Sequence, residues 1–103
     1  MATVINITNK IKNEEKFLVV GENKYRVDDR KNTVTEVMAL FDDASKGDFE
    51  RMDEALRLLI GGEAFAEVEE MNLPLTDYQA IFIGAMACVN GKTYEETEAT
   101  FRG

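Results

Sequence analysis

The hydrophobic positions in the first third of the chain have the short spacing of β-strands. Residues 17–20 and 24–28 are two β-prone runs separated by the loop-forming residues 21–23, so we expect a hairpin with a short loop. Residues 4–7 form another β-prone run and are a candidate third strand. The hydrophilic residues 8–16 predict a loop or a short helix between these runs.

From Asn32 onward the apolar positions follow the 3.6-residue period of an α-helix. The expected apolar faces are Val34, Val37, Met38 and Phe41; Phe49, Met52, Leu56, Leu59 and Ile60; Phe65, Val68 and Met71; Tyr78, Ile81, Phe82, Ala85, Met86 and Val89; and Tyr94 with Phe101. The expected boundaries are capping boxes at Thr33 with Glu36, Thr76 with Gln79 and Thr93 with Glu96, an N-cap at Asp48, and stops at Gly47, Gly61-Gly62, Leu73-Pro74 and Gly91. The fourth helix is apolar nearly all round, so we expect it to be buried on most sides, centrally or against another subunit.

These elements predict an α+β fold that is predominantly helical, with an N-terminal β-hairpin followed by four to five short amphipathic helices. The 103 residues suit a single domain, residues 1–103, with a hairpin segment at 1–31 and a helical segment at 32–103. No stretch reaches the ~20 apolar residues of a membrane span, and the first residues do not resemble a secretory signal. The single cysteine, Cys88, favours a reducing, intracellular setting.

Charge is distributed unevenly along the chain, whose formal net charge is −8. Residues 1–31 hold seven Lys and Arg against five Asp and Glu, which gives +2. Residues 32–103 hold five against fifteen, which gives −10. Such a surface repels phosphate backbones, so we expect neither nucleic acid nor a membrane as a partner. It favours a basic protein partner, or serves only to keep the protein soluble.

The composition argues against catalysis, because the chain has no histidine. Nucleophilic triads and a structural zinc site are therefore excluded on residue count, and Cys88 is expected to be a buried, inert thiol. Residues 42–48 resemble a calcium loop, but Ala44 and Lys46 occupy two ligand positions, so a capped turn is the better interpretation. Gly61-Gly62 lacks the Lys-Ser/Thr of a phosphate loop. We predict no enzyme activity, no catalytic residue, no metal and no cofactor.

Candidate residues for partner binding come from two patterns. Glu63, Glu67 and Glu70 lack the convergent polar partners of an acid–base pair, and we interpret them as a solvated face that meets basic residues of a partner. Tyr94 and Phe101 become exposed anchors if the last helix does not fold back on the domain. The methionine-rich helices suit adaptable protein surfaces, although most of these residues are expected to be ordinary core.

The order of these features resembles a family of phage proteins. The residues that carry the resemblance are KYRVD at 24–28, a helix ending in Leu40-Phe41, LLIGGEA at 58–64, YQAIF at 78–82, the helix restart at 91–96, and Phe101. Over residues 17–103 the chain resembles the small tail assembly chaperones of long-tailed (siphovirus-type) phages and prophages of Gram-positive bacteria. The residues before Phe17 and the strong acidity depart from that pattern.

The resemblance implies a non-catalytic chaperone that binds and solubilises the tape measure protein until major tail protein polymerises around it. It also implies self-association, a frameshifted longer form, a place in the cytoplasm of the bacterial host and absence from the mature virion. The family has no invariant catalytic or metal motif to carry over. The alternative, from charge alone, is an acidic inhibitor that mimics nucleic acid, of the anti-restriction or anti-CRISPR type.

Overall fold

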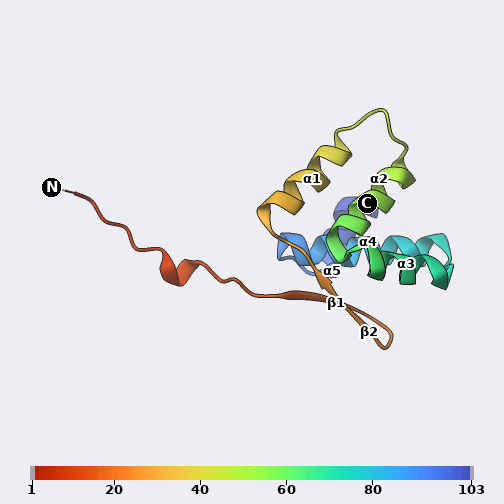
Figure 1. Ribbon diagram of the computed structural model, residues 1–103, viewed down its shortest axis with the longest axis horizontal. Coiled ribbons are helices and arrows are strands. Elements are labelled where there is room, and N and C mark those ends of the chain that lie inside the picture. Colours follow the sequence, from red (N-terminus) through yellow and green to blue (C-terminus); the bar gives the residue numbers. More distant parts are fainter. Residues whose placement is uncertain (1, 103) are drawn as a thin grey trace.

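The computed structural model describes residues 2–102 and shows one hairpin followed by five helices (Figure 1). The elements are β1 (Lys16–Val20), β2 (Asn23–Val27), α1 (Lys31–Phe41), α2 (Asp48–Ile60), α3 (Gly62–Met71), α4 (Leu75–Asn90) and α5 (Tyr94–Arg102). A single turn of 3₁₀ helix at Thr8–Lys10 precedes them. The predicted fold class, α+β and predominantly helical, is confirmed. None of the helices in this described part is long and apolar enough to cross a membrane.

The hairpin is antiparallel and turns at Gly21 and Glu22; the loop is one residue shorter than expected, because Asn23 already belongs to β2. Gly21 has a φ of 62°, a left-handed conformation that glycine adopts without steric cost. Leu18 lies opposite Tyr25 in the register, and both side chains are on the face that packs against the helices. The hairpin is thus one layer of the core and not an appendage.

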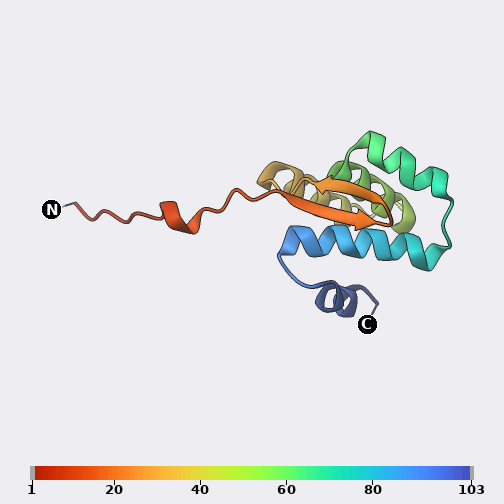
Figure 2. The ribbon, with the colours of Figure 1, turned by 90° about the horizontal axis from the view of Figure 1, so that it is seen from below.

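Helix α4 is the centre of the fold, as its all-round apolar sequence predicted. Figure 2 shows it between the hairpin on one side and α5 on the other, and α2 packs against it as well. Phe82 is 2% exposed and has the ring of Phe41 and the ring of Phe101 at its edges. Gly84 faces β1, where an added Cβ would lie 2.7 Å from Leu18 Cδ1, so the absence of a side chain there permits the close approach of hairpin and helix.

Asp28 joins the hairpin to two helices. Its backbone N–H donates to the Leu59 carbonyl at the end of α2, at 2.7 Å. Its carboxylate accepts from the Arg30 backbone and guanidinium and from the Thr33 hydroxyl at 2.7 Å, at the start of α1. These hydrogen bonds, with the Arg30 guanidinium as the largest cause, lower the pKa of Asp28 from 3.8 to about 2.

Residues 2–15, which we call the arm, correct one expectation. Residues 4–7 form no strand, and the hairpin of the described chain is two-stranded. The arm projects from the body in both ribbon views (Figures 1 and 2). Its apolar side chains Val4, Ile5, Ile7 and Ile11 are 86%, 78%, 54% and 67% exposed. The β-propensity of this segment is therefore not satisfied within its own chain.

Three expected helix boundaries also differ, one of them because a tertiary contact takes the polar side chain. Thr33 bonds to Asp28 and does not cap, and α1 begins two residues earlier, at Lys31. Gly47 is the residue before α2 and does not end α1, which stops at Phe41. At α4 the residue before the helix is Pro74, and no side chain caps it. The Thr93–Glu96 capping box is confirmed, with the two residues exchanging hydrogen bonds.

We expect Phe82→Ala to destabilise the protein by about 3–5 kcal/mol, because it leaves a cavity among three elements. The matched control is Phe49→Ala, which removes a ring that is 52% exposed and should lose less than about 1 kcal/mol. Urea denaturation of both variants measures the difference. A loss below about 1 kcal/mol for Phe82→Ala would contradict the central position of α4 in the core.

Asp28→Ala should cost about 1–2 kcal/mol of unfolding free energy at pH 7, after allowance for solvent around the exposed Arg30. The folded pKa of about 2 lies below the ordinary value of 3.8, so this stabilisation is complete above the ordinary value and is lost as the pH falls towards 2. The difference in unfolding free energy between wild type and variant, measured by urea denaturation, should therefore become smaller at acid pH. Glu70→Ala, at an exposed position, serves as the control. An equal loss of unfolding free energy in that variant would show that Asp28 does not link the hairpin to the helices.

Candidate functional site

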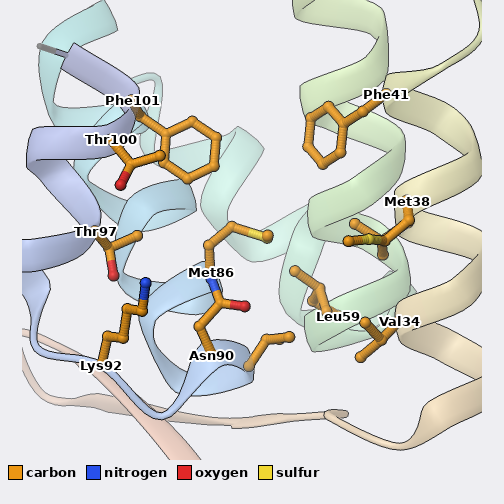
Figure 3. A pocket seen from close by; sticks show the side chains of 12 residues that line it. Val34, Met38, Phe41, Leu59, Met86, Asn90, Lys92, Thr97, Thr100 and Phe101 are labelled. Carbon is orange, nitrogen blue, oxygen red and sulfur yellow. The ribbon is translucent and has the colours of Figure 1, made fainter.

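An apolar groove opens on the surface between α1, α4 and α5, with one residue of α2 at its base (Figure 3). The hollow has a volume of about 250 Å³. Twelve residues, which we call the groove, line it: Val34, Val37, Met38, Phe41, Leu59, Met86, Val89, Asn90, Lys92, Thr97, Thr100 and Phe101. A concave, mostly apolar surface with a few polar groups at its edge is typical of a binding site.

One wall of the groove comes from α1, the helix whose apolar face was expected to be core. Of that face only Val37 is buried, at 1% exposed, while Met38 is 61% exposed. Figure 3 shows Val34, Met38 and Phe41 directed towards the side chains of α5 across the opening. The sequence left open which residues of this face are core and which face a partner. Met38 is exposed because no element of the described chain packs over it.

The opposite wall comes from α5, where Thr97, Thr100 and Phe101 point towards α1 (Figure 3). The Thr93–Glu96 capping box begins this helix. Arg102 holds its end against α4 by donating to the Thr76 carbonyl at 2.8 Å. The last helix therefore folds back on the domain, and the condition under which both Tyr94 and Phe101 become free anchors is not met.

The two aromatic residues of α5 consequently have different surroundings. Phe101 is 44% exposed, lies in the groove and has its ring centroid 5.5 Å from that of Phe82. Tyr94 is half-buried beside Leu18 and Gly84, on the hairpin side of α4. Of these two candidates for partner binding, only Phe101 belongs to the groove.

The three glutamates proposed for partner binding lie elsewhere, on α3. Glu63, Glu67 and Glu70 are all exposed and follow the i, i+4, i+7 spacing of one helix face. None of them lines the groove. Glu67 is close to the buried Tyr25, and burial together with this carboxylate raises the pKa of Tyr25. The structure thus separates an acidic row on α3 from the apolar groove.

Groups with shifted pKa values have structural explanations. Burial raises the pKa of the Cys88 thiol, which donates to the Phe17 carbonyl at 3.6 Å and stays protonated. Burial and the hydrogen bond that its hydroxyl donates to Asp53 raise the pKa of Tyr78, and this bond connects α4 to α2. Across residues 2–102 there is no group of three His, Cys, Asp or Glu side chains placed to hold a metal ion.

Several groove residues had no sequence signal for binding. Thr97 and Thr100 stand at i and i+3 on α5, next to Phe101 at i+4, and this spacing alone marks a common face. Lys92 and Asn90 are at the edge of the groove, where the loop between α4 and α5 brings them. Helix spacing can identify such a face, but not the element across from it.

Comparison of the chain with protein-family models, with curated proteins and with solved structures gives no significant match. The resemblance to tail assembly chaperones therefore stays a hypothesis from hydrophobic pattern. Three features of the structure bear on function: the groove, the acidic row on α3 and the exposed arm.

Proposed function

We propose that the chain is a non-catalytic tail assembly chaperone of a long-tailed phage or prophage, which binds and solubilises the tape measure protein during tail assembly. The observation that carries the proposal is the open groove between α1, α4 and α5. An apolar groove between helices suits the apolar face of an amphipathic partner helix. The tape measure protein is a long helical chain whose apolar faces must be kept from water until major tail protein polymerises around it.

The dimensions of the groove fit this occupant. Along α1 it extends from Val34 to Phe41, which at 1.5 Å per residue is about 10 Å, or two helical turns. A partner helix would place anchors at i, i+3 or i+4, and i+7 over that length. Met38 and Met86 lie on opposite sides of the groove, and their flexible side chains can adapt to different anchors along a repetitive client.

Charge supports a basic client. The helical segment carries −10, and the row Glu63, Glu67 and Glu70 is exposed on α3. Long-range attraction between this segment and a basic chain would increase the rate of encounter, and apolar contacts in the groove would supply most of the affinity. We infer a role in the bacterial cytoplasm, before the virion is complete, with major tail protein as the component that displaces the chaperone.

The acidic inhibitor remains a second candidate, because the α3 carboxylates form a row on one helix face. A nucleic-acid mimic would bind a basic cleft through that row, and its affinity would fall steeply with salt. Replacing Glu63, Glu67 and Glu70 with glutamine removes the charge and retains the shape. This candidate would be favoured if the wild type inhibits a nuclease at low salt and the triple variant does not.

We expect co-expression with a helical fragment of the tape measure protein from the same phage or prophage to give a soluble complex. Met38→Glu should weaken that complex at least about tenfold, because it places a charge in the apolar groove. Met38 is mostly exposed, so the variant should keep its fold, and its thermal unfolding verifies this. Titration calorimetry of the fragment measures the two affinities.

The matched control is Leu75→Glu, which adds the same charge at a side chain that is 53% exposed at the other end of α4. Its affinity for the fragment should equal that of the wild type. A fragment that stays insoluble with the wild type, or equal losses in both variants, would contradict binding through the groove.

A further inference from the structure

A second hollow lies where the start of α2, the end of α3 and the start of α4 meet. Figure 2 shows the connection from α3 to α4 at the end of the molecule opposite the arm. The hollow has a volume of about 280 Å³ and shares no residue with the groove. We call it the corner; it is lined by Phe49, Asp53, Val68, Glu69, Leu75 and Tyr78, together with residues 72–73 of the connection.

The corner has apolar side chains that the fold leaves uncovered. Phe49, in the first turn of α2, and Leu75, in the first turn of α4, are 52% and 53% exposed. Neither belongs to the hydrophobic core, whereas Val68, which also lines the hollow, is buried. Large apolar side chains exposed on two different helices around one hollow are typical of an interaction site.

The charge of the corner is negative. The carboxylates of Asp53 and Glu69 line it, and its lining in the described chain includes no lysine or arginine. Neither carboxylate forms an ion pair with another residue of 2–102. Arg57, one turn along α2 from Asp53, lies instead over the ring of Phe65, with its Cζ 4.8 Å from the ring centroid. The corner therefore offers two carboxylates to a cation from outside the chain.

The hydroxyl of Tyr78 relates the two carboxylates to each other. It donates to Oδ1 of Asp53, which leaves Oδ2 available to a second donor. Burial, this hydrogen bond and the negative charges of Asp53 and Glu69 raise the pKa of Tyr78, and the charge of Arg57 opposes the rise. Both carboxylates are thus close to one hydroxyl group, and a cation that reaches this place is attracted to both.

We propose that the corner binds an arginine of a protein partner, together with a large apolar side chain beside that arginine. The guanidinium is planar, so it can donate to Asp53 and Glu69 while one of its faces lies on the exposed ring of Phe49. The neighbouring apolar side chain covers Leu75 and removes it from water. A lysine would supply the charge without the planar face and the fixed set of donors.

The size of the corner suits a pair of side chains. Its volume is below the roughly 300–1,000 Å³ of pockets that enclose a whole small molecule. On α4 the groove begins at Met86, eight residues or about 12 Å along the helix from Tyr78. A helix of two turns in the groove does not reach the corner. The inference therefore goes beyond the proposed function, because it concerns a different surface and requires no tape measure protein.

Titration of the full chain with the peptide acetyl-Leu-Arg-Leu-amide, followed by nuclear magnetic resonance, tests the corner. The amide signals of Phe49, Asp53, Glu69 and Leu75 should shift, with a dissociation constant of about 1 mM. The same peptide with citrulline in place of arginine keeps the shape without the charge, and it should bind at least about tenfold more weakly. Equal affinity of the two peptides, or no shift at these residues, would overturn the proposal.

Two double variants separate local contacts from general attraction to an acidic surface. Asp53→Asn combined with Glu69→Gln should weaken binding of the arginine peptide at least about tenfold, and an asparagine at position 53 can still accept from Tyr78. The matched control, Glu63→Gln combined with Glu67→Gln, removes the same charge from exposed positions of α3 outside the corner. Its affinity should stay within about twofold of the wild type. Equal losses in both double variants would contradict a local site.

Single variants test the ring and the separation from the groove. Phe49→Ala should weaken binding of the arginine peptide about threefold, because the guanidinium loses the face on which it lies. Met38→Glu, in the groove, should leave the affinity unchanged. Full affinity in Phe49→Ala would contradict the stacked arrangement, and a loss in Met38→Glu would place the peptide in the groove. Thermal unfolding verifies that each variant is folded; should the Asp53 double variant unfold, Glu69→Gln alone is expected to weaken binding about threefold. Because the tape measure protein takes no part, none of these results bears on the proposed function.

Discussion

The apolar surface of α4 is the constraint on which the rest of the structure depends. Leaving a large apolar side chain in water costs about 1.5–3 kcal/mol relative to burying it, and α4 has such side chains on nearly every side. The hairpin, α2 and α5 each cover one of these sides. The helix is left partly uncovered in its first turn, where Leu75 is 53% exposed, and towards its last turns, where Met86 and Val89 line the groove. The groove is thus the unfilled part of the same core.

The hydrophobic period was sufficient to predict this arrangement at low detail. It identified the hairpin, all five helices and the central position of the fourth, because each depends on which residues share a face. The local polar signals were less reliable. Thr33 and Glu36 have capping-box spacing, yet the Thr33 hydroxyl bonds to Asp28, five residues earlier. The hydrogen bond to this carboxylate, which the hairpin places beside Thr33, forms in place of the local capping bond. The sequence around Thr33 does not indicate that the carboxylate lies there.

The groove could not be predicted for a related reason. Val37 and Met38 are neighbours on one predicted face, but Val37 is buried and Met38 is exposed. The difference arises because α2 packs along one edge of α1, whereas α5 stops short of the other. Likewise, residues 4–7 have the composition of a strand, and a strand requires a partner that the chain does not place beside them. Sequence spacing shows which residues need cover, and only the fold shows which of them receive it.

The uneven charge of the chain bears on which partner the groove can accept. An acidic client would be repelled by the helical segment. The chain carries +2 in residues 1–31 and −10 in residues 32–103, so that basic segments are attracted to the helical face and two helical faces repel each other. Apolar grooves alone would allow uncontrolled stacking of copies. The charge division favours contacts between a basic client and the helical segment, and it disfavours contacts between the helical segments of two copies.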